Sequence, residues 1–410
     1  MSFLQSIRLS GFLSFPPDSP TIELSPLNVL IGPNGSGKSN LLEAFELLRA
    51  TPMGLAAFLR AGGTAQEWIW KGEPWARVAQ RAEIDIVAED VVFPWDADAG
   101  YKLHYFLSVA SSGQSRFVLN EVIEDFNESN RGAENVQVYY SNREGPPVIS
   151  VADMNRNGSR PEPMSYTPRQ LEKGSLRYDE SVLSQFKDHV SYPEITWLGQ
   201  TFARIQTFRD WTFGRSAPLR RPQPGDLPID ALLDNSDNLG LVLNELQISS
   251  VNSEFNRLLS RFLPRYDRFS TRIQGNTVQF FLHEKGLGTP VPAARLSDGT
   301  IRFMAILAVL LSPSPPPLVT IEEPELGLHP DAVGLLADVM VEASSRMQIV
   351  ATTHSDAFIS ALTDSAGSVL VCENLRGTTV ERIDPAKLEF WLDKYRLGEI
   401  WRIGEIGGNP

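Results

Sequence analysis

The N-terminal part of the chain alternates apolar and polar positions with the period of a β-strand and then changes to a helical period. Strand-like alternation covers residues 7–9 and 21–24, and a continuous apolar run covers 27–31. A helical stripe follows over 40–50, formed by Leu41, Leu42, Phe45 and Leu48. These periods predict strands that lead directly into a helix.

The strand period returns four times between residues 76 and 141, separated by turns rich in Gly, Ser, Asp and Asn. This pattern predicts antiparallel strands at 82–87, 103–109, 117–123 and 136–140. Residues 142–181 are polar and rich in Pro, Gly, Arg and Ser, so we expect a loop. Residues 181–263 have mainly helical periods, ending in an amphipathic helix over 251–263.

The last third begins with two strand-like runs at 269–273 and 277–283 and then alternates helices with strands. Helices are predicted at 296–311, 330–343 and 355–362. Apolar strands are predicted at 318–321, 348–352 and 368–372. Such alternation is typical of a parallel, doubly wound α/β sheet.

The composition narrows the class of protein but does not indicate its chemistry. The 410 residues are 42% hydrophobic and 21% charged, which is ordinary for a globular protein of more than one domain. A net charge of −13 argues against general nucleic-acid binding but leaves room for a local basic patch. Cys372 is the single cysteine and the five histidines are scattered, so neither a disulfide nor a zinc cluster is expected.

The N-terminus lacks a basic region followed by a long apolar run, so no signal peptide is predicted. The longest apolar stretch, 303–311, is far shorter than the roughly 20 residues that cross a membrane. We therefore expect a cytoplasmic protein without a membrane partner.

A glycine-rich segment joins the strand at 27–31 to the following helix. It reads Gly32-Pro33-Asn34-Gly35-Ser36-Gly37-Lys38-Ser39 and fits the phosphate-loop pattern G-x-x-x-x-G-K-[ST] at every fixed position. Its backbone N–H groups and the helix N-terminus suit phosphate oxygens. Lys38 is predicted to contact the β- and γ-phosphates of ATP, Ser39 to bind Mg²⁺, and Asn40 to belong to the nucleotide-binding set.

The strand at 318–321 ends in carboxylates. Glu322 is predicted to hold the metal and Glu323 to act as the general base that polarises the attacking water. Two further segments fit the same chemistry. Ser297 and Gly299 lie at a helix start, where anions bind, and His354 follows an apolar strand, where it could sense the γ-phosphate.

Together these motifs resemble the ABC-type ATPase heads of the SMC/RecF/OLD group, often described as AAA-type ATPases. The segment 32–39 resembles Walker A, 296–300 the signature motif, 319–323 Walker B, and His354 the switch histidine. The run 323–330 resembles the EPE-x-GLHP stretch of the group, and 7–15 its first strand and turn. The resemblance is good over 1–50 and 290–375 and loose between them.

The resemblance implies an α/β fold: a P-loop NTPase head with a mixed sheet, an antiparallel β subdomain and an inserted, mainly helical lobe. It divides the chain into the first part of the head, a loop-rich and helical insertion, the second part of the head, and a tail, at 1–141, 142–264, 265–385 and 386–410. It also implies a homodimer closed around ATP, in which Ser297 and Gly299 of one copy meet the γ-phosphate held by Lys38 of the other.

The chain departs from the group's pattern at three points. Asp298 stands where a glycine is usual, and Glu322 stands where Asp is commoner. The glutamine of the Q-loop has no clear position, with Gln185 and Gln200 as candidates.

Two groups of arginines raise the question of DNA binding. They either hold phosphates or form a salt-bridged face. The groups are Arg257, Arg261, Arg265, Arg268 and Arg272, and Arg204, Arg209, Arg215, Arg220 and Arg221.

Two functions remain open at this point. In the first, an ATPase acts on DNA in repair or recombination. In the second, a regulatory ATPase of a phage-defence or toxin-type system controls a separate nuclease or effector protein. A transporter ATPase subunit is a weaker third option, against which the long insertion argues.

Overall fold

The computed structural model describes residues 3–72, 81–93, 96–112, 116–126, 136–143, 145–153, 165–172, 174–209 and 211–407. The chain divides into two compact units. We call Ser2–Ile205 with Leu370–Arg382 the phosphate-loop unit, and Gln206–Val369 with Ile383–Asn409 the carboxylate unit. Each is described by itself.

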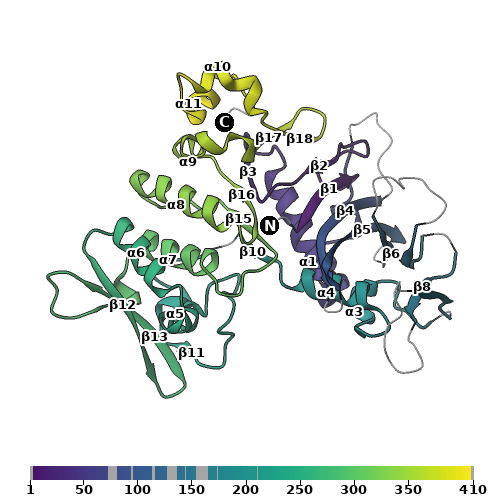
Figure 1. The fold of residues 1–410 in the computed structure, drawn as a ribbon, viewed down its shortest axis with the longest axis horizontal. Coiled ribbons are helices and arrows are strands. Elements are labelled where there is room, and N and C mark those ends of the chain that lie inside the picture. Colours follow the sequence, from purple (N-terminus) through teal and green to yellow (C-terminus); the bar gives the residue numbers. More distant parts are fainter. Residues whose placement is uncertain are drawn as a thin grey trace. The chain divides into compact units, whose positions relative to one another are not determined.

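An antiparallel sheet forms most of the phosphate-loop unit (Figure 1). Its strand order is β2-β1-β4-β5-β6-β7-β8-β9, so that β4 to β9 form a meander. The predicted antiparallel strands are therefore confirmed. The bounds are β1 Leu4–Ser10, β2 Ile22–Glu23, β4 Arg81–Phe93, β5 Asp96–Ser112, β6 Arg116–Asp125, β7 Val138–Ser141, β8 Val148–Ala152 and β9 Tyr166–Gln170.

The expectation of a loop over 142–181 is wrong where β8 and β9 form. The outermost strand, β9, exposes nearly all of its side chains, so it shows no apolar alternation that a sequence pattern could detect. Residues 154–164 of the expected loop lie outside the described part of the chain.

The rest of the phosphate-loop unit consists of the predicted strand–loop–helix and its neighbours. Strand β3 has the predicted bounds, Leu27–Ile31, and every one of its residues is buried. The long helix α1 bends at Gly54. The other elements are α1 Lys38–Ala61, α2 Ala65–Trp68, α3 Val182–Gln185, α4 Pro193–Ala203, β17 Val369–Asn374 and β18 Thr378–Arg382.

Parallel strands carry the predicted acidic motif in the carboxylate unit. Strand β15, Leu318–Glu322, pairs in parallel with β10, Gln206–Phe208, and with β16, Gln348–Thr352. Because parallel strands end at the same edge of a sheet, the residues that follow these three strands are brought together. The parallel arrangement predicted for this part of the chain is confirmed.

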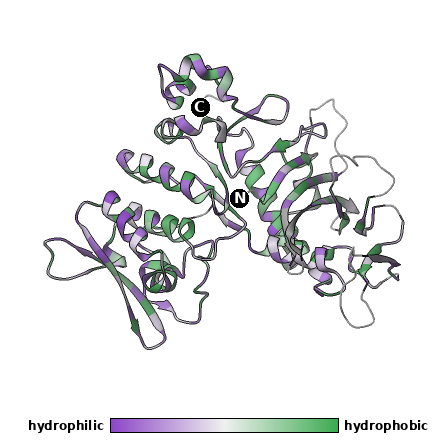
Figure 2. Ribbon diagram, viewed as in Figure 1, coloured by the Kyte–Doolittle hydropathy of each residue, from purple (hydrophilic) through white to green (hydrophobic). Residues whose placement is uncertain are grey.

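A helical and antiparallel region completes the carboxylate unit (Figure 1). Helix α7 is buried along almost its whole length and is correspondingly apolar (Figure 2). The helices are α5 Leu239–Ile248, α6 Asn252–Phe262, α7 Asp298–Leu310, α8 Pro330–Ala343, α9 Asp356–Ala361, α10 Glu389–Leu392 and α11 Leu397–Arg402. The short strands and the hairpin are β11 Gln223–Pro224, β12 Tyr266–Gln274, β13 Thr277–Glu284 and β14 Val291–Pro292.

Short 3₁₀ segments connect these elements, at Pro218–Arg220, Ala293–Arg295, Thr363–Ser368 and Pro385–Leu388. No helix within the described ranges is long and apolar enough to span a membrane.

Candidate functional site: a phosphate loop and a carboxylate end

The loop between β3 and α1 has the backbone geometry of an anion cradle. Gly32, Gly35 and Gly37 have φ angles of 148°, 78° and 98°, in the region that favours glycine. A Cβ atom at Gly32 would lie 2.2 Å from the carbonyl oxygen of Cys372, and one at Gly37 would lie 2.0 Å from Oγ1 of Thr378. Glycine is therefore required at both positions, for conformation and for space.

Lys38 is the first residue of α1, and its ammonium group folds back over the loop. Its Nζ donates to the carbonyl oxygens of Gly32 at 2.7 Å and Pro33 at 3.0 Å, and lies 3.5 Å from Ser36 Oγ. The side chain is buried. A cation held by loop carbonyls at a helix N-terminus fits the phosphate groups of a nucleotide.

Side chains from elsewhere in the phosphate-loop unit support the loop. Thr378 Oγ1 donates to the carbonyl oxygen of Ser36 at 3.0 Å, and Asn374 Nδ2 donates to that of Gly35 at 3.0 Å. Asn40, predicted to belong to the nucleotide-binding set, donates its amide to Ser14 Oγ at 2.7 Å. Sequence reasoning missed Thr378 and Asn374 because they follow the loop by more than 330 residues.

The second part of the candidate site lies where strands β10, β15 and β16 end, and we call it the carboxylate end. It begins with Glu322, the last residue of β15. Its Oε2 lies 3.3 Å from Nε of Arg209, the residue that follows the neighbouring strand β10. Both side chains are about three-quarters buried, which strengthens the attraction between them. The sequence places Arg209 in a group that either holds phosphates or forms a salt-bridged face, and in the structure it pairs with the predicted metal ligand.

Glu323 has a φ angle of 46°, which is unusual for a residue with a side chain and costs about 1–2 kcal/mol. Its N–H donates to the carbonyl oxygen of Thr352 at 3.1 Å, so the end of β16 holds the turn. Its Oε1 lies 3.8 Å from Nε2 of His354. The predicted general base and the predicted γ-phosphate sensor are thus neighbours.

Glu325 is a further buried carboxylate at this end. Its Oε1 accepts hydrogen bonds from Thr353 Oγ1 and from the backbone N–H of His354, the latter at 3.4 Å. Its Oε2 is buried and has no hydrogen-bond partner in the described part of the chain. Burial raises the pKa of the Glu325 carboxyl above its ordinary value.

The predicted signature corner is a capped helix start. Ser297 Oγ accepts the backbone N–H of Thr300 at 3.1 Å. Gly299 packs so closely on the backbone of Gly327 that a Cβ atom would lie 2.7 Å from its carbonyl oxygen. Asp298, at the position where a glycine is usual, forms an ion pair with Arg220. That arginine is only 3% exposed and also donates to the carbonyl oxygens of Phe213, Ala293 and Leu296.

Both glutamine candidates for the Q-loop belong to the phosphate-loop unit, whereas the parallel strands belong to the carboxylate unit. Gln185 donates to backbone carbonyls around the start of α3, and Gln200 is exposed on α4. Arg209 is the residue that follows the strand next to β15. A weak signal for this strand existed, since Ile205, Thr207 and Phe208 are residue types that favour strands, within the region expected to be helical.

The arginines of the first group, which runs from Arg257 to Arg272, each contact an acidic or aromatic residue. Arg257 bonds to Glu254 at 2.7 Å, and Arg272 stacks on Phe281 with 5.1 Å from its Cζ to the ring centre. Three more have acidic neighbours at 3.6–3.8 Å, namely Arg261 with Asp338, Arg265 with Glu284 and Arg268 with Asp267. These contacts favour the salt-bridged interpretation of the group.

The predicted metal ligands, Ser39 and Glu322, are oxygen donors, which Mg²⁺ prefers. No group of three or more His, Cys, Asp or Glu side chains that could hold a metal occurs among the described residues. Mg²⁺ typically uses one or two carboxylates together with substrate phosphates and water. The predicted pair, Ser39 and Glu322, has that character.

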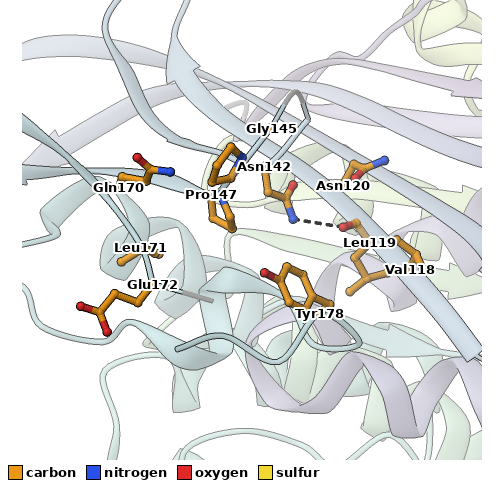
Figure 3. A pocket seen from close by; sticks show the side chains of 11 residues that line it. Val118, Leu119, Asn120, Asn142, Gly145, Pro147, Gln170, Leu171, Glu172 and Tyr178 are labelled. Carbon is orange, nitrogen blue, oxygen red and sulfur yellow. Dashed lines mark hydrogen bonds between the residues drawn. The ribbon is translucent and has the colours of Figure 1, made fainter. Parts of the chain in front are cut away.

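A cavity of about 700 Å³ lies elsewhere in the phosphate-loop unit, between β6 and the segments that flank β8 and β9 (Figure 3). Tyr178, Pro147 and Leu171 line it, and Asn142 on its wall donates to the carbonyl oxygen of Leu119 at 3.1 Å. None of the predicted nucleotide or metal residues lines this cavity.

The fold and these motifs define an ABC-type ATPase head of the SMC/OLD-like kind. The chain belongs to the family described as "AAA domain, putative AbiEii toxin, Type IV TA system", which it matches over residues 27–86 and 173–360. The members of this class are ATPases that use a nucleotide and, as a rule, Mg²⁺.

Solved structures share the fold at low sequence identity. The SMC head bound to the C-terminal winged-helix domain of ScpA has a TM-score of 0.59 and 15% identity, with 94% of this chain and 99% of that chain covered. The SMC head with an extended coiled coil from Pyrococcus furiosus has a TM-score of 0.56 and 15% identity, with 96% and 99% covered.

Two curated proteins match over shorter segments. The chromosome partition protein Smc of Rhodopirellula baltica is 30% identical over 118 residues, which are 29% of this chain and 10% of that protein. The Old nuclease of Escherichia phage P2 is 36% identical over 73 residues, 18% of this chain and 12% of that protein. The chain thus matches about a tenth of the length of these relatives.

Proposed function

We propose that this chain binds ATP with Mg²⁺ and hydrolyses it to ADP and phosphate. The observation that carries the proposal is the phosphate loop, in which Lys38 is held over the glycine-rich backbone at the start of α1. When bound, Mg²⁺ would neutralise phosphate charge and fix the geometry of the γ-phosphate. Ser39 and Glu322 would hold it.

The carboxylate end supplies the remaining groups. Glu323 orients and deprotonates the attacking water, and His354, whose Nε2 is 3.8 Å from Glu323 Oε1, senses the γ-phosphate. The ion pair between Arg209 and Glu322 holds the metal carboxylate in place.

We further propose that two copies close around ATP. The capped start of α7, with Ser297 and Gly299, presents backbone N–H groups and a helix dipole to an anion. The resemblance to SMC-type heads supports a γ-phosphate from a second copy as that anion. Dimerisation would then complete the catalytic site.

The central test is Glu323→Gln, which keeps the shape of the side chain and removes the base. ATP affinity should be retained, turnover should fall by about 10²–10⁴-fold, and ATP should trap a stable dimer visible by light scattering. Glu342→Gln, an exposed residue of α8, removes the same charge and should behave as wild type. Wild-type turnover in Glu323→Gln would refute the general-base assignment.

For the biological role, we favour control of a separate effector, such as a nuclease or toxin, over direct work on DNA. Three observations support this choice: the description of the family, the match to the Old nuclease, and the acidic partners of the first arginine group.

Two experiments separate these roles. If the ATPase acts on DNA, duplex DNA should raise turnover, and changing Arg261, Arg265 and Arg268 to Ser should abolish that increase. If it controls an effector, the product of a neighbouring gene should co-purify stoichiometrically, and its activity should depend on ATP hydrolysis by this chain.

A further inference from the structure

Arg302 links helix α7 to the turn that presents Glu323. It lies five residues after Ser297 and is 8% exposed. Its Nη2 donates to the carbonyl oxygen of Glu323 at 2.7 Å. The predicted signature corner and the support of the predicted general base therefore lie on one helix, about 7–8 Å apart along its axis.

The hydrogen bond from Arg302 restrains a part of the backbone that has an unfavourable conformation. Glu323 has a positive φ angle, and such a conformation persists when its surroundings hold it from several sides. Thr352 holds the N–H of Glu323 from β16, and Arg302 holds the carbonyl oxygen from α7. Removing the second contact would leave the carbonyl oxygen of Glu323 without the restraint from α7.

Aromatic rings and charges fix the guanidinium in this place. Its Cζ lies 5.7 Å from the ring centre of Trp211 and 5.8 Å from that of Phe213. Its Nε is buried without a hydrogen-bond partner among the described residues. Its Nη2 donates the hydrogen bond to the carbonyl oxygen of Glu323. Burial lowers the pKa of Arg302, and the carboxylates of Glu325 and Glu323 oppose this by favouring its positive charge.

We propose that Arg302 is a positioning residue that sets the orientation of Glu323 and couples it to the start of α7. The proposal rests on the ATPase function proposed above. Contact of Ser297 with the γ-phosphate of a second copy would shift or stiffen α7, and Arg302 would transmit this to the backbone that carries the base. Hydrolysis would thus depend on closure of the dimer.

The test compares Arg302→Met with Arg302→Lys in the full chain. Arg302→Met removes the donor and keeps an unbranched side chain between the rings, so kcat should fall about 10–100-fold while ATP affinity changes less than about twofold. Arg302→Lys retains a cation and a donor and should recover part of the loss. In a Glu323→Gln background, Arg302→Met should lower the remaining turnover no further, because both act through one group.

Arg346→Met is the matched control. Arg346 also donates to backbone carbonyl oxygens of the carboxylate unit, those of Leu310 and Ser312, but it lies outside the predicted site. Its loss should leave kcat unchanged even where it lowers the melting temperature.

Three outcomes are decisive. Wild-type kcat in a folded Arg302→Met variant would overturn the positioning role. If that variant does not fold, Arg302→Lys provides the test. A wild-type kcat together with a wild-type dependence of turnover on protein concentration would then overturn the positioning role as well. Absence of ATP hydrolysis by the wild-type chain would instead refute the proposed function itself.

Discussion

The two halves of the predicted ATPase chemistry are built in different ways. The phosphate loop is one stretch of eight residues, and its shape comes from glycine φ angles and from backbone carbonyls that hold Lys38. The carboxylate end uses side chains from the ends of three strands and from α7, with Arg209, Arg302 and Glu322 as examples. The first is formed by consecutive residues with tertiary support from Thr378 and Asn374, and the second is assembled from distant residues, so they should fail differently when altered.

The largest effect on stability should come from crowding the loop, as in Gly37→Ala. The new Cβ would collide with Thr378 at a φ of 98°, and we expect a loss of about 3 kcal/mol from strain and overpacking together. Gly35→Ala has a φ of 78° but no atom within 4 Å, and should lose about 1 kcal/mol. Denaturant unfolding measures both, and equal losses would contradict the packing argument.

A smaller effect is expected when the lysine is removed and the loop backbone is kept. Lys38→Ala should lower ATP affinity about 10–100-fold, as the loss of charge-assisted hydrogen bonds of about 1.5–3 kcal/mol implies. Lys71→Ala, an exposed lysine of the same unit paired with Glu67, is the control and should bind ATP as wild type. Isothermal titration calorimetry makes the comparison. Normal affinity in Lys38→Ala would refute the phosphate-loop assignment.

The smallest effect on stability is expected from a rise in pH, which should weaken the phosphate-loop unit. His104 lies between Asp85 at 3.0 Å and Glu124 at 2.8 Å on three adjacent strands, and these carboxylates, opposed by burial, raise its pKa to about 9. Because the folded pKa exceeds the unfolded value of about 6.5, the stabilisation is complete below pH 6.5 and is lost as pH rises through 9. We expect a change of about 1–2 kcal/mol, reduced by the partial exposure of the carboxylates.

His104→Gln should abolish this pH dependence, whereas His189→Gln, an exposed histidine of the same unit, should leave it intact. Hydrogen exchange at several pH values resolves the two units, with the carboxylate unit as internal reference. A wild-type profile that is flat between pH 6.5 and 9 would contradict the assignment.

The contrast between features formed by neighbouring residues and features assembled from distant ones also explains what the sequence could predict. Strand β3 and helix α8 have the predicted bounds, because each depends on residues close together in the chain. The edge strand β9 was missed because its polar residues face outward.

The roles of Arg209 and Arg220 were missed for a different reason. Arg220 bonds to carbonyl oxygens up to 76 residues away, and Arg209 meets a carboxylate 113 residues away. Clustering along the chain made these arginines look like a phosphate-binding surface. Only the fold shows that each one has an internal acceptor.

The environment of Cys372 has a practical consequence. Its backbone carbonyl packs against Gly32, and burial raises the pKa of its thiol to about 12. A thiol that is buried and protonated at neutral pH does not react with maleimides. The natural chain is therefore already a background for site-specific labelling, and cysteines at the exposed positions Met53 and Ile248 would place one dye in each unit. Energy transfer between those dyes would measure the distance between the two units in solution, with no native cysteine removed first.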